Sequence, residues 1–243
     1  MQIKSITAFL ILTCITSHTN AQQIELGINA NSGWHYFAGD DARKMTGIIL
    51  SPSPQPQVYS LFGKHSGFSY EFSCHIQRVT KKKMIYGVAV AYQSLQSKAD
   101  ITLISPSVIS SAVFPATGNS TVTSKFIGIT PYAGYRIIDR RVTLDFRSGL
   151  ELAYCIDRDE KIDAVYTQTG EKLNEEYDVY ANRSDLRISF QLNGTYRSMG
   201  INAGYFLGIK NHFDDDSIGD PEVYSRFFWL GISYTIKTWN SSR

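Results

Sequence analysis

The chain has 243 residues, enough for one large β-domain or two small ones. Charged residues make up only 19% of it, below the roughly 25% that is usual for soluble domains, whereas Tyr (15), Phe (13) and Gly (18) are plentiful. The formal net charge of +2 is too small to indicate a nucleic-acid-binding protein.

The N-terminal segment has the parts of a secretory signal peptide. Lys4 supplies a positive charge, residues 6–15 form a short apolar run, and Ala21 places a small residue at a cleavage site. The run is too short for a membrane-spanning helix. Cys14 raises a lipoprotein alternative, which Thr13 before it disfavours. The sequence therefore predicts a signal peptide at residues 1–21 and a mature β-barrel domain at 22–243.

From residue 23 onward, apolar and polar residues alternate in segments of about ten residues. Alternation with period two is typical of β-strands that have one apolar face. Residues 67–77 show the pattern most clearly, and 226–237 close the series. We expect eight strands, at residues 23–31, 67–77, 84–94, 122–137, 142–154, 185–197, 201–210 and 226–237.

The connections between these strands alternate between long and short. Prolines at 52, 54 and 56 exclude a paired strand from the first long connection. An even number of strands with this rhythm of connections is typical of transmembrane β-barrels. We expect long loops at 34–66, 95–121 and 155–184, and short turns at Lys81-Lys82-Lys83, Asp139-Arg140-Arg141 and Ser198-Met199-Gly200.

Alternation alone fits a soluble barrel with an apolar interior as well as a membrane barrel with an apolar exterior. Three features favour the membrane barrel. Glycines gather on the polar face, where a narrow lumen needs small residues. Aromatic residues lie near the strand ends of the apolar face, and charged residues avoid that face. The sequence therefore predicts an all-β, eight-stranded antiparallel up-and-down transmembrane β-barrel with Phe72, Val90, Leu192 and Ile232 facing lipid.

The polar faces carry charges of both signs. An eight-stranded barrel has an interior only wide enough for side chains, and buried charges must be paired. We therefore expect a closed lumen that holds a carboxylate–guanidinium network rather than an open pore. The residues expected there are Glu25, Glu71, His75, Arg136, Asp145, Arg147, Glu151, Arg187, Lys210 and Lys237.

The last strand resembles the assembly signal that ends bacterial outer-membrane barrels, with Gly231 followed by the apolar residues Tyr234 and Ile236. It departs from that signal at Trp229 and in the residues that follow the strand. Together with Ala21-Gln22-Gln23 and residues 127–136, it makes the chain resemble the small outer-membrane β-barrel proteins of Bacteroidota, the group called porin-family or PorT-like. The resemblance implies an outer-membrane location, OmpA-like topology, outer-membrane lipid and the barrel-assembly machinery as partners, and no catalytic residues.

Glu71, Ser73 and His75 form the one arrangement that suggests catalysis. All three belong to the polar face of one strand, so a Ser–His–acid set can be imagined. A lumen-facing set cannot reach an acyl chain in the bilayer, and we expect a packed polar lumen instead. The sequence therefore predicts no catalytic, cofactor-binding or metal-binding residues. The expected role is structural or interactive, with a small-solute channel and a lipid-modifying enzyme as alternatives.

Three further features bear on the loops and cysteines. Asp214-Asp215-Asp216 lacks the spacing of a calcium-binding loop, which favours a solvated acidic loop. Cys74 and Cys155 lie on faces of opposite parity, so we expect no disulfide between them. The second long loop contains apolar residues that predict either a hairpin extended above the membrane or a contact for an unknown partner: Ile104, Val108, Ile109, Val113 and Phe114.

Overall fold

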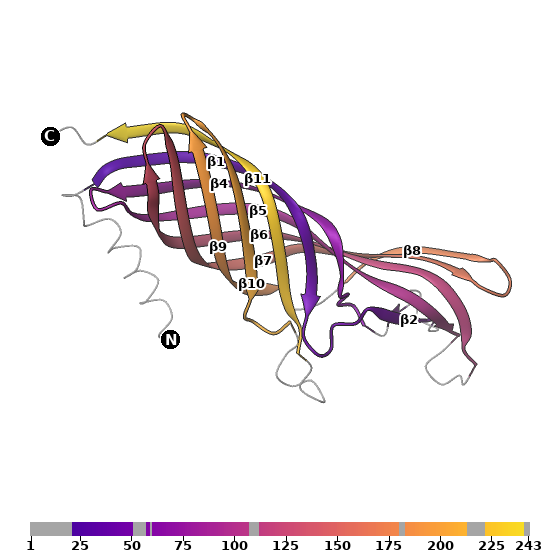
Figure 1. The fold of residues 1–243 in the computed structure, drawn as a ribbon. Coiled ribbons are helices and arrows are strands. Elements are labelled where there is room, and N and C mark those ends of the chain that lie inside the picture. The colour runs from indigo at the N-terminus through magenta and orange to yellow at the C-terminus, as the bar shows by residue number, and fades with distance from the viewer. Residues whose placement is uncertain are drawn as a thin grey trace, which may run out of the picture.

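The computed structural model describes residues 21–50, 57–58, 60–106, 112–179, 183–212 and 222–240. Within these ranges the chain is all-β and forms eleven strands of one continuous sheet. Eight long strands build a barrel, and three shorter ones lie beyond one of its ends (Figure 1). The predicted signal peptide lies outside the described residues except for Ala21, which begins β1.

The barrel is closed. Each of its strands pairs with the next along the chain in antiparallel fashion, and β1 completes the ring by pairing with β11 from Gln23↔Asn240 to Ala38↔Tyr224. This ring confirms the predicted eight-stranded up-and-down barrel. Its strands are β1 (Ala21–Ala38), β4 (His65–Thr80), β5 (Met84–Ser105), β6 (Phe114–Asp139), β7 (Val142–Tyr166), β9 (Ser184–Tyr196), β10 (Met199–Gly208) and β11 (Tyr224–Asn240).

Three tight hairpins join β4 to β5, β6 to β7 and β9 to β10 at one end of the barrel, which we call the turn end. Lys83 (φ 66°) and Arg197 (φ 56°) adopt the left-handed conformation that such short connections require. β1 begins and β11 ends at this same end (Figure 1). The three short turns predicted from the sequence are confirmed, the third of them shifted so that β10 already begins at Met199.

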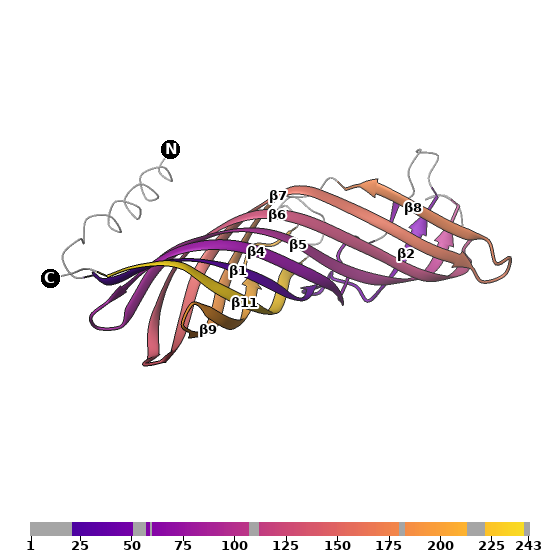
Figure 2. The ribbon, with the colours of Figure 1, turned by 90° about the horizontal axis from the view of Figure 1, so that it is seen from above.

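At the opposite end, three barrel strands continue beyond the barrel and are joined there by three further strands of the same sheet. β2 (Met45–Ile49) pairs in parallel with β5, β3 (Gln57–Val58) pairs with β2, and β8 (Lys172–Asp178) pairs with β7. We call this part of the sheet the extension; it comprises β2, β3 and β8 with residues 97–105, 114–124 and 158–166 of β5, β6 and β7. Figure 2 shows it projecting from the barrel along the direction of the barrel strands.

The expected long loops at 34–66, 95–121 and 155–184 are therefore wrong over much of their length. β1 continues to Ala38, β5 and β6 form the longer hairpin that the apolar residues Ile104 and Phe114 suggested, and β7 continues to Tyr166. Polar residues dominate these segments because the outer face of the extension is exposed. Val108, Ile109, the prolines at 52, 54 and 56 and the acidic loop Asp214-Asp215-Asp216 lie outside the described residues.

The side chains of the barrel point as the sequence predicts. Phe72, Val90, Leu192 and Ile232 are 57%, 46%, 47% and 62% exposed on the outer surface, whereas the polar residues between them are buried in the lumen. An apolar exterior around a polar interior is the reverse of a soluble barrel and is the arrangement that lipid requires. In the described part of the chain, no helix combines the length and apolar character needed to cross a membrane.

Two residues expected in the lumen lie elsewhere. A register shift on β11 skips Ile236, so Lys237 pairs with the outward-facing Leu26 and its ammonium lies 5.2 Å from the ring centre of Trp239. Such a bulge reverses the parity of every residue beyond it. Lys210 follows the last residue of β10 and its ammonium donates to Ser184 at the barrel rim.

Candidate functional site: a filled lumen and a projecting sheet

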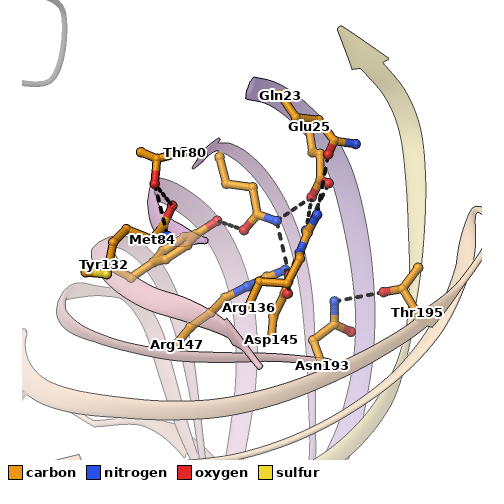
Figure 3. Close-up of polar contacts among 11 residues, drawn as sticks. Gln23, Glu25, Thr80, Met84, Tyr132, Arg136, Asp145, Arg147, Asn193 and Thr195 are labelled. Carbon is orange, nitrogen blue, oxygen red and sulfur yellow. Dashed lines mark hydrogen bonds and ion pairs between the residues drawn. The ribbon is translucent and has the colours of Figure 1, made fainter. Parts of the chain in front are cut away.

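An ion network closes the lumen near the turn end (Figure 3). The guanidinium of Arg136 donates from Nε and Nη2 to both carboxylate oxygens of Asp145 (2.8 and 3.1 Å) and from Nη2 to Glu25 (2.9 and 3.0 Å). Arg147 also donates to Asp145 (3.3 Å), and Gln77 donates to Glu25 (2.5 Å). Bidentate pairing compensates buried charges most completely. The predicted carboxylate–guanidinium network is thus confirmed.

The middle of the lumen is held together by Gln93. Its amide nitrogen donates to Glu71 (2.8 Å) and to Glu151 (2.7 Å), and its carbonyl oxygen accepts from Arg187 (2.7 Å). Arg187 also donates to Glu151 (3.1 Å), and Asn31 donates to Glu71 (2.9 Å). These contacts join β1, β4, β5, β7 and β9 across the barrel, so this layer ties opposite walls together.

One small cavity lies beside this layer. Its volume is about 40 Å³, and its lining includes Glu71, His75, Arg147 and Glu151. A cavity needs roughly 10–15 Å³ for each water molecule, so this one holds no more than a few. The lining offers polar groups that suit water, and the small volume excludes a larger solute.

An apolar plug occupies the lumen between this layer and the extension. Phe206 packs against Trp229 with ring centres 4.6 Å apart, and Trp229 against Phe227 at 5.4 Å. The guanidinium of Arg187 lies 4.5 Å from the ring centre of Phe126, a cation–π contact that joins the plug to the layer around Gln93. The plug consists of Leu95, Phe126, Ala153, Cys155, Phe206, Phe227 and Trp229, all buried.

A second apolar group caps the lumen at the end nearer the extension. Phe37 and Phe62 pack edge to face at 4.8 Å, together with Ala42 and Val223. The ring of His212 lies 5.1 Å from that of Phe37. Ions, small cavity, plug and cap thus follow one another along the lumen, and the side chains that fill it come from the barrel strands and from the connections at their ends.

The candidate set of Glu71, Ser73 and His75 faces this filled interior. Asn29 donates to the hydroxyl of Ser73 (3.0 Å) and contacts Nδ1 of His75 (3.3 Å). All three residues are buried, and Glu71 is committed to Gln93 and Asn31. The structure therefore brings the three together as part of the lumen packing, on the side of the strand away from lipid.

Three carboxylates gather where β7 leaves the barrel, a feature that the sequence analysis missed. Asp157, Asp159 and Asp178 hold oxygen atoms within 4.8 Å of one another. The ammonium of Lys125 already lies among them, 2.5 Å from Asp157 and 3.4 Å from Asp159. These contacts with the carboxylates raise the pKa of Lys125. Only the pairing of β7 with β8 brings Asp178 beside the other two, so sequence spacing could not reveal the group.

The extension has its own interior. It is an apolar cluster of buried residues: Ile48, Ile101, Ile104, Ala116, Ile162 and Ala164. Glu160 is buried beside them, and it accepts hydrogen bonds from the hydroxyl groups of Ser120 and Tyr177 (the latter 2.7 Å). Burial raises the pKa of Glu160, and burial beside this carboxyl group raises that of Tyr177. The extension is therefore a folded sheet with a core rather than a set of loops.

The outward-facing residues of β11 show the height of the apolar band around the barrel. Arg226 and Lys237 are the outward-facing cations at its two ends, and the residues between them on that face are apolar or aromatic. At roughly 3.3 Å per residue and a tilt of about 40°, the eleven steps from Arg226 to Lys237 cover about 28 Å, close to the roughly 30 Å of a bilayer core. Exposed aromatic side chains lie near both limits: Trp34, Phe68, Tyr154 and Phe228 toward the extension, and Tyr86, Tyr135, Tyr196 and Tyr234 toward the turns.

Similarity to known proteins is found among solved structures only. No family model matches the chain, and no curated protein matches it. The crystal structure of Neisserial surface protein A (NspA) is similar with a TM-score of 0.40 and 11% identity over 87% of this chain and 97% of that one. The translocator domain of the autotransporter NalP from Neisseria meningitidis gives a TM-score of 0.28 and 8% identity over 95% of this chain and 94% of that one. The barrel itself is established by the pairing of this chain's own strands.

Proposed function

We propose that this chain is a non-enzymatic outer-membrane β-barrel protein that acts through its extension, in a structural or interaction role. The observation that carries the proposal is the filled lumen. Side chains occupy it from the Arg136 network to the cap around Phe37, so the barrel serves as an anchor rather than a conduit. What remains for contact with other molecules is the projecting sheet.

The outer-membrane location is supported by the apolar band, by the aromatic residues at its limits and by the signal-peptide pattern at residues 1–21. In barrels of this kind the short turns lie in the periplasm and the longer connections lie outside. We therefore assign the turn end to the periplasm and the extension to the cell surface. Gly231, Tyr234 and Ile236 on β11 would then serve recognition by the barrel-assembly machinery. We also propose that the chain is a member of the PorT-like group of outer-membrane proteins of Bacteroidota.

Heat-modifiable gel mobility of the mature protein, extracted in detergent, tests the barrel assignment. A closed membrane barrel resists detergent at room temperature and unfolds on boiling, so the two samples should migrate differently. Identical mobility before and after boiling would remove the basis of the proposal.

Conductance across a planar bilayer tests the anchor against a small-solute channel. With a filled lumen, the purified protein should leave the bilayer without persistent open steps. Stable steps that recur in independent insertions would replace the anchor by a channel.

Mass spectra of lipid A from cells with and without the protein test the third alternative, a lipid-modifying enzyme. We expect no change, because Glu71, Ser73 and His75 are buried on the lumen side of β4. A mass difference that disappears in the Ser73→Ala variant would establish an enzyme.

A further inference from the structure

β8 forms one edge of the extension. One side of this strand pairs with β7, from Asp159↔Asp178 to Val165↔Lys172. Among the described strands, none pairs with the other side. The strand has seven residues and no proline, so alternate N–H and C=O groups along it point away from the sheet. Such an edge is a template for one more strand.

The apolar side chains of this edge are incompletely covered. Leu173 and Tyr177 are half-buried and pack on the same apolar cluster as Ile162. Val58, on the opposite edge of the extension, is also half-buried against that cluster. The two edges therefore border one apolar interior, and a strand added to β8 would cover side chains that the extension alone leaves partly in water.

The edge is acidic. Glu175, Glu176 and Asp178 are exposed on β8, and Lys172 is the one basic residue of the strand. The neighbouring base on β7, Lys161, already pairs with Asp163 at 3.2 Å. A partner strand would therefore meet Glu175 on one face of the sheet and Glu176 on the other. Lys161 lies opposite Glu176 in register, but neither carboxylate forms an ion pair within the described residues.

We propose that β8 binds an extended basic segment of another protein by strand addition. Backbone hydrogen bonds supply the attachment in this mode, and alternate side chains supply the selectivity. In register, basic residues of the segment lie opposite Glu175 and Glu176, and apolar residues lie opposite Leu173 and Tyr177. The expected segment thus has two adjacent basic residues. The basic residue opposite Glu175 shares its face of the strand with two apolar residues, one two positions before it and one two positions after it.

A second copy of the same chain does not fit this edge. β8 runs along the length of the extension, so two barrels side by side in one membrane hold their β8 strands parallel (Figures 1 and 2). Glu175, Glu176 and Asp178 of the two copies would then lie at equal heights. Like charges placed opposite each other destabilise a sheet.

This inference rests on the proposed interaction role of the extension, and it is tested on the full mature chain in detergent micelles. The probe is a fluorescent nine-residue peptide of alternating threonine and valine with two central lysines. Two peptides serve as controls: one with glutamates in place of the lysines, and one with the same side chains but alternate backbone nitrogens methylated. N-methylation removes the donors that a sheet ladder needs and keeps the charge.

Fluorescence anisotropy at low salt should show the lysine peptide binding at least about ten-fold more tightly than either control peptide. The double variant Glu175→Lys, Glu176→Lys should lose that binding about ten-fold and should prefer the glutamate peptide. Glu171→Lys, which makes one such charge reversal in the connection before β8, should retain it within about two-fold. Hydrogen exchange at residues 172–178 should slow when the lysine peptide is bound.

Equal binding of the N-methylated peptide would mean that charge attraction alone holds the peptide, and would overturn strand addition. Strand addition would also be overturned if the lysine peptide did not bind, or if it bound the double variant as tightly as the unaltered chain. Dimers that depend on Glu175 and Glu176 would identify a second copy as the occupant instead. Each variant is first checked for heat-modifiable mobility. If the barrel is folded but binds all peptides equally, only this inference is contradicted. If the unaltered chain shows no heat-modifiable mobility shift, the proposed function is contradicted.

Discussion

Glu160 shows how a single carboxyl group can couple the extension to pH. It is buried without an ion-pair partner among the described residues, and its hydrogen bonds come from Ser120 and Tyr177. Burial favours the neutral form, so its pKa is raised in the folded extension. A protonated carboxyl group can donate as well as accept, which suits an apolar interior.

The raised pKa fixes the direction of the pH dependence. The contribution of Glu160 to stability is fully present below the pKa of the unfolded chain, about 4.3 for Glu, and is lost as pH rises through the raised value of the folded extension. Limited proteolysis of the extension should therefore accelerate from mildly acidic to neutral pH. Glu160→Gln should remove this dependence, and Asp163→Asn, at an exposed acid on the same strand, should retain it. An unchanged pH profile in Glu160→Gln would contradict the assignment.

Arg136 is the residue on which the network near the turn end depends. Replacing it by Met leaves Glu25 and Asp145 without their main cation in a buried site, which costs about 3–5 kcal/mol. The temperature at which the heat-modifiable band is lost should fall markedly. Arg140→Met, in an exposed turn nearby, should change stability by no more than about 0.5 kcal/mol. Equal effects of the two substitutions would mean that the network does not stabilise the barrel.

At the scale of elements, the plug is the part of the lumen most sensitive to truncation. Trp229 is 2% exposed and its indole N–H donates to Asn202 (3.2 Å). Trp229→Ala removes a large buried side chain and should cost about 3–5 kcal/mol. Trp239→Ala, on the outer face of the same strand and 41% exposed, should cost less. Because the Arg136 network still closes the lumen, planar-bilayer recordings of the Trp229 variant should remain free of open steps.

The barrel strands could be predicted because each has lipid on one face and the packed polar lumen on the other. Apolar and polar residues therefore alternate along the strand with period two. The extension was missed because water bathes its outer face and its strands carry small or charged residues. A signal was nevertheless present. In Lys161-Ile162-Asp163-Ala164, buried apolar residues alternate with exposed charged ones inside the expected long loop at 155–184. Lys237 was misplaced for a different reason, since strict alternation cannot foresee the bulge at Ile236.

At the scale of the whole molecule, position along the apolar band sets the cost of a charge. Ile232 lies in the middle of that band and is 62% exposed, whereas Ile24 pairs with Trp239 near its limit. Ile232→Arg should destabilise the protein in a bilayer by about 2–4 kcal/mol, and Ile24→Arg by no more than about 1 kcal/mol. Urea unfolding in liposomes measures both. Equal costs would argue against a bilayer around this band.

The closed barrel, its inside-out side chains and most of the lumen network followed from the sequence, because all three depend on parity within single strands. Contacts made by bringing distant strands together did not follow. The Asp157, Asp159 and Asp178 group needs β8 beside β7, and the plug needs Phe206 and Trp229 to meet Phe126 across the lumen. Parity identifies which side chains share the interior, but stagger between strands decides which of them touch.

β6 and β7 belong to the barrel and to the extension alike, with only a one-residue register shift at Phe126 and Cys155 between the two parts. Residues 114–124 of β6 alone reach about 36 Å at roughly 3.3 Å per residue. A pulling force applied to the far end of the extension is therefore transmitted along continuous strands into the wall of the barrel. Because the hydrogen bonds between strands run perpendicular to them, such a force must shear many of these bonds at once. The extension should therefore behave as a stiff projection rather than as a flexible linker.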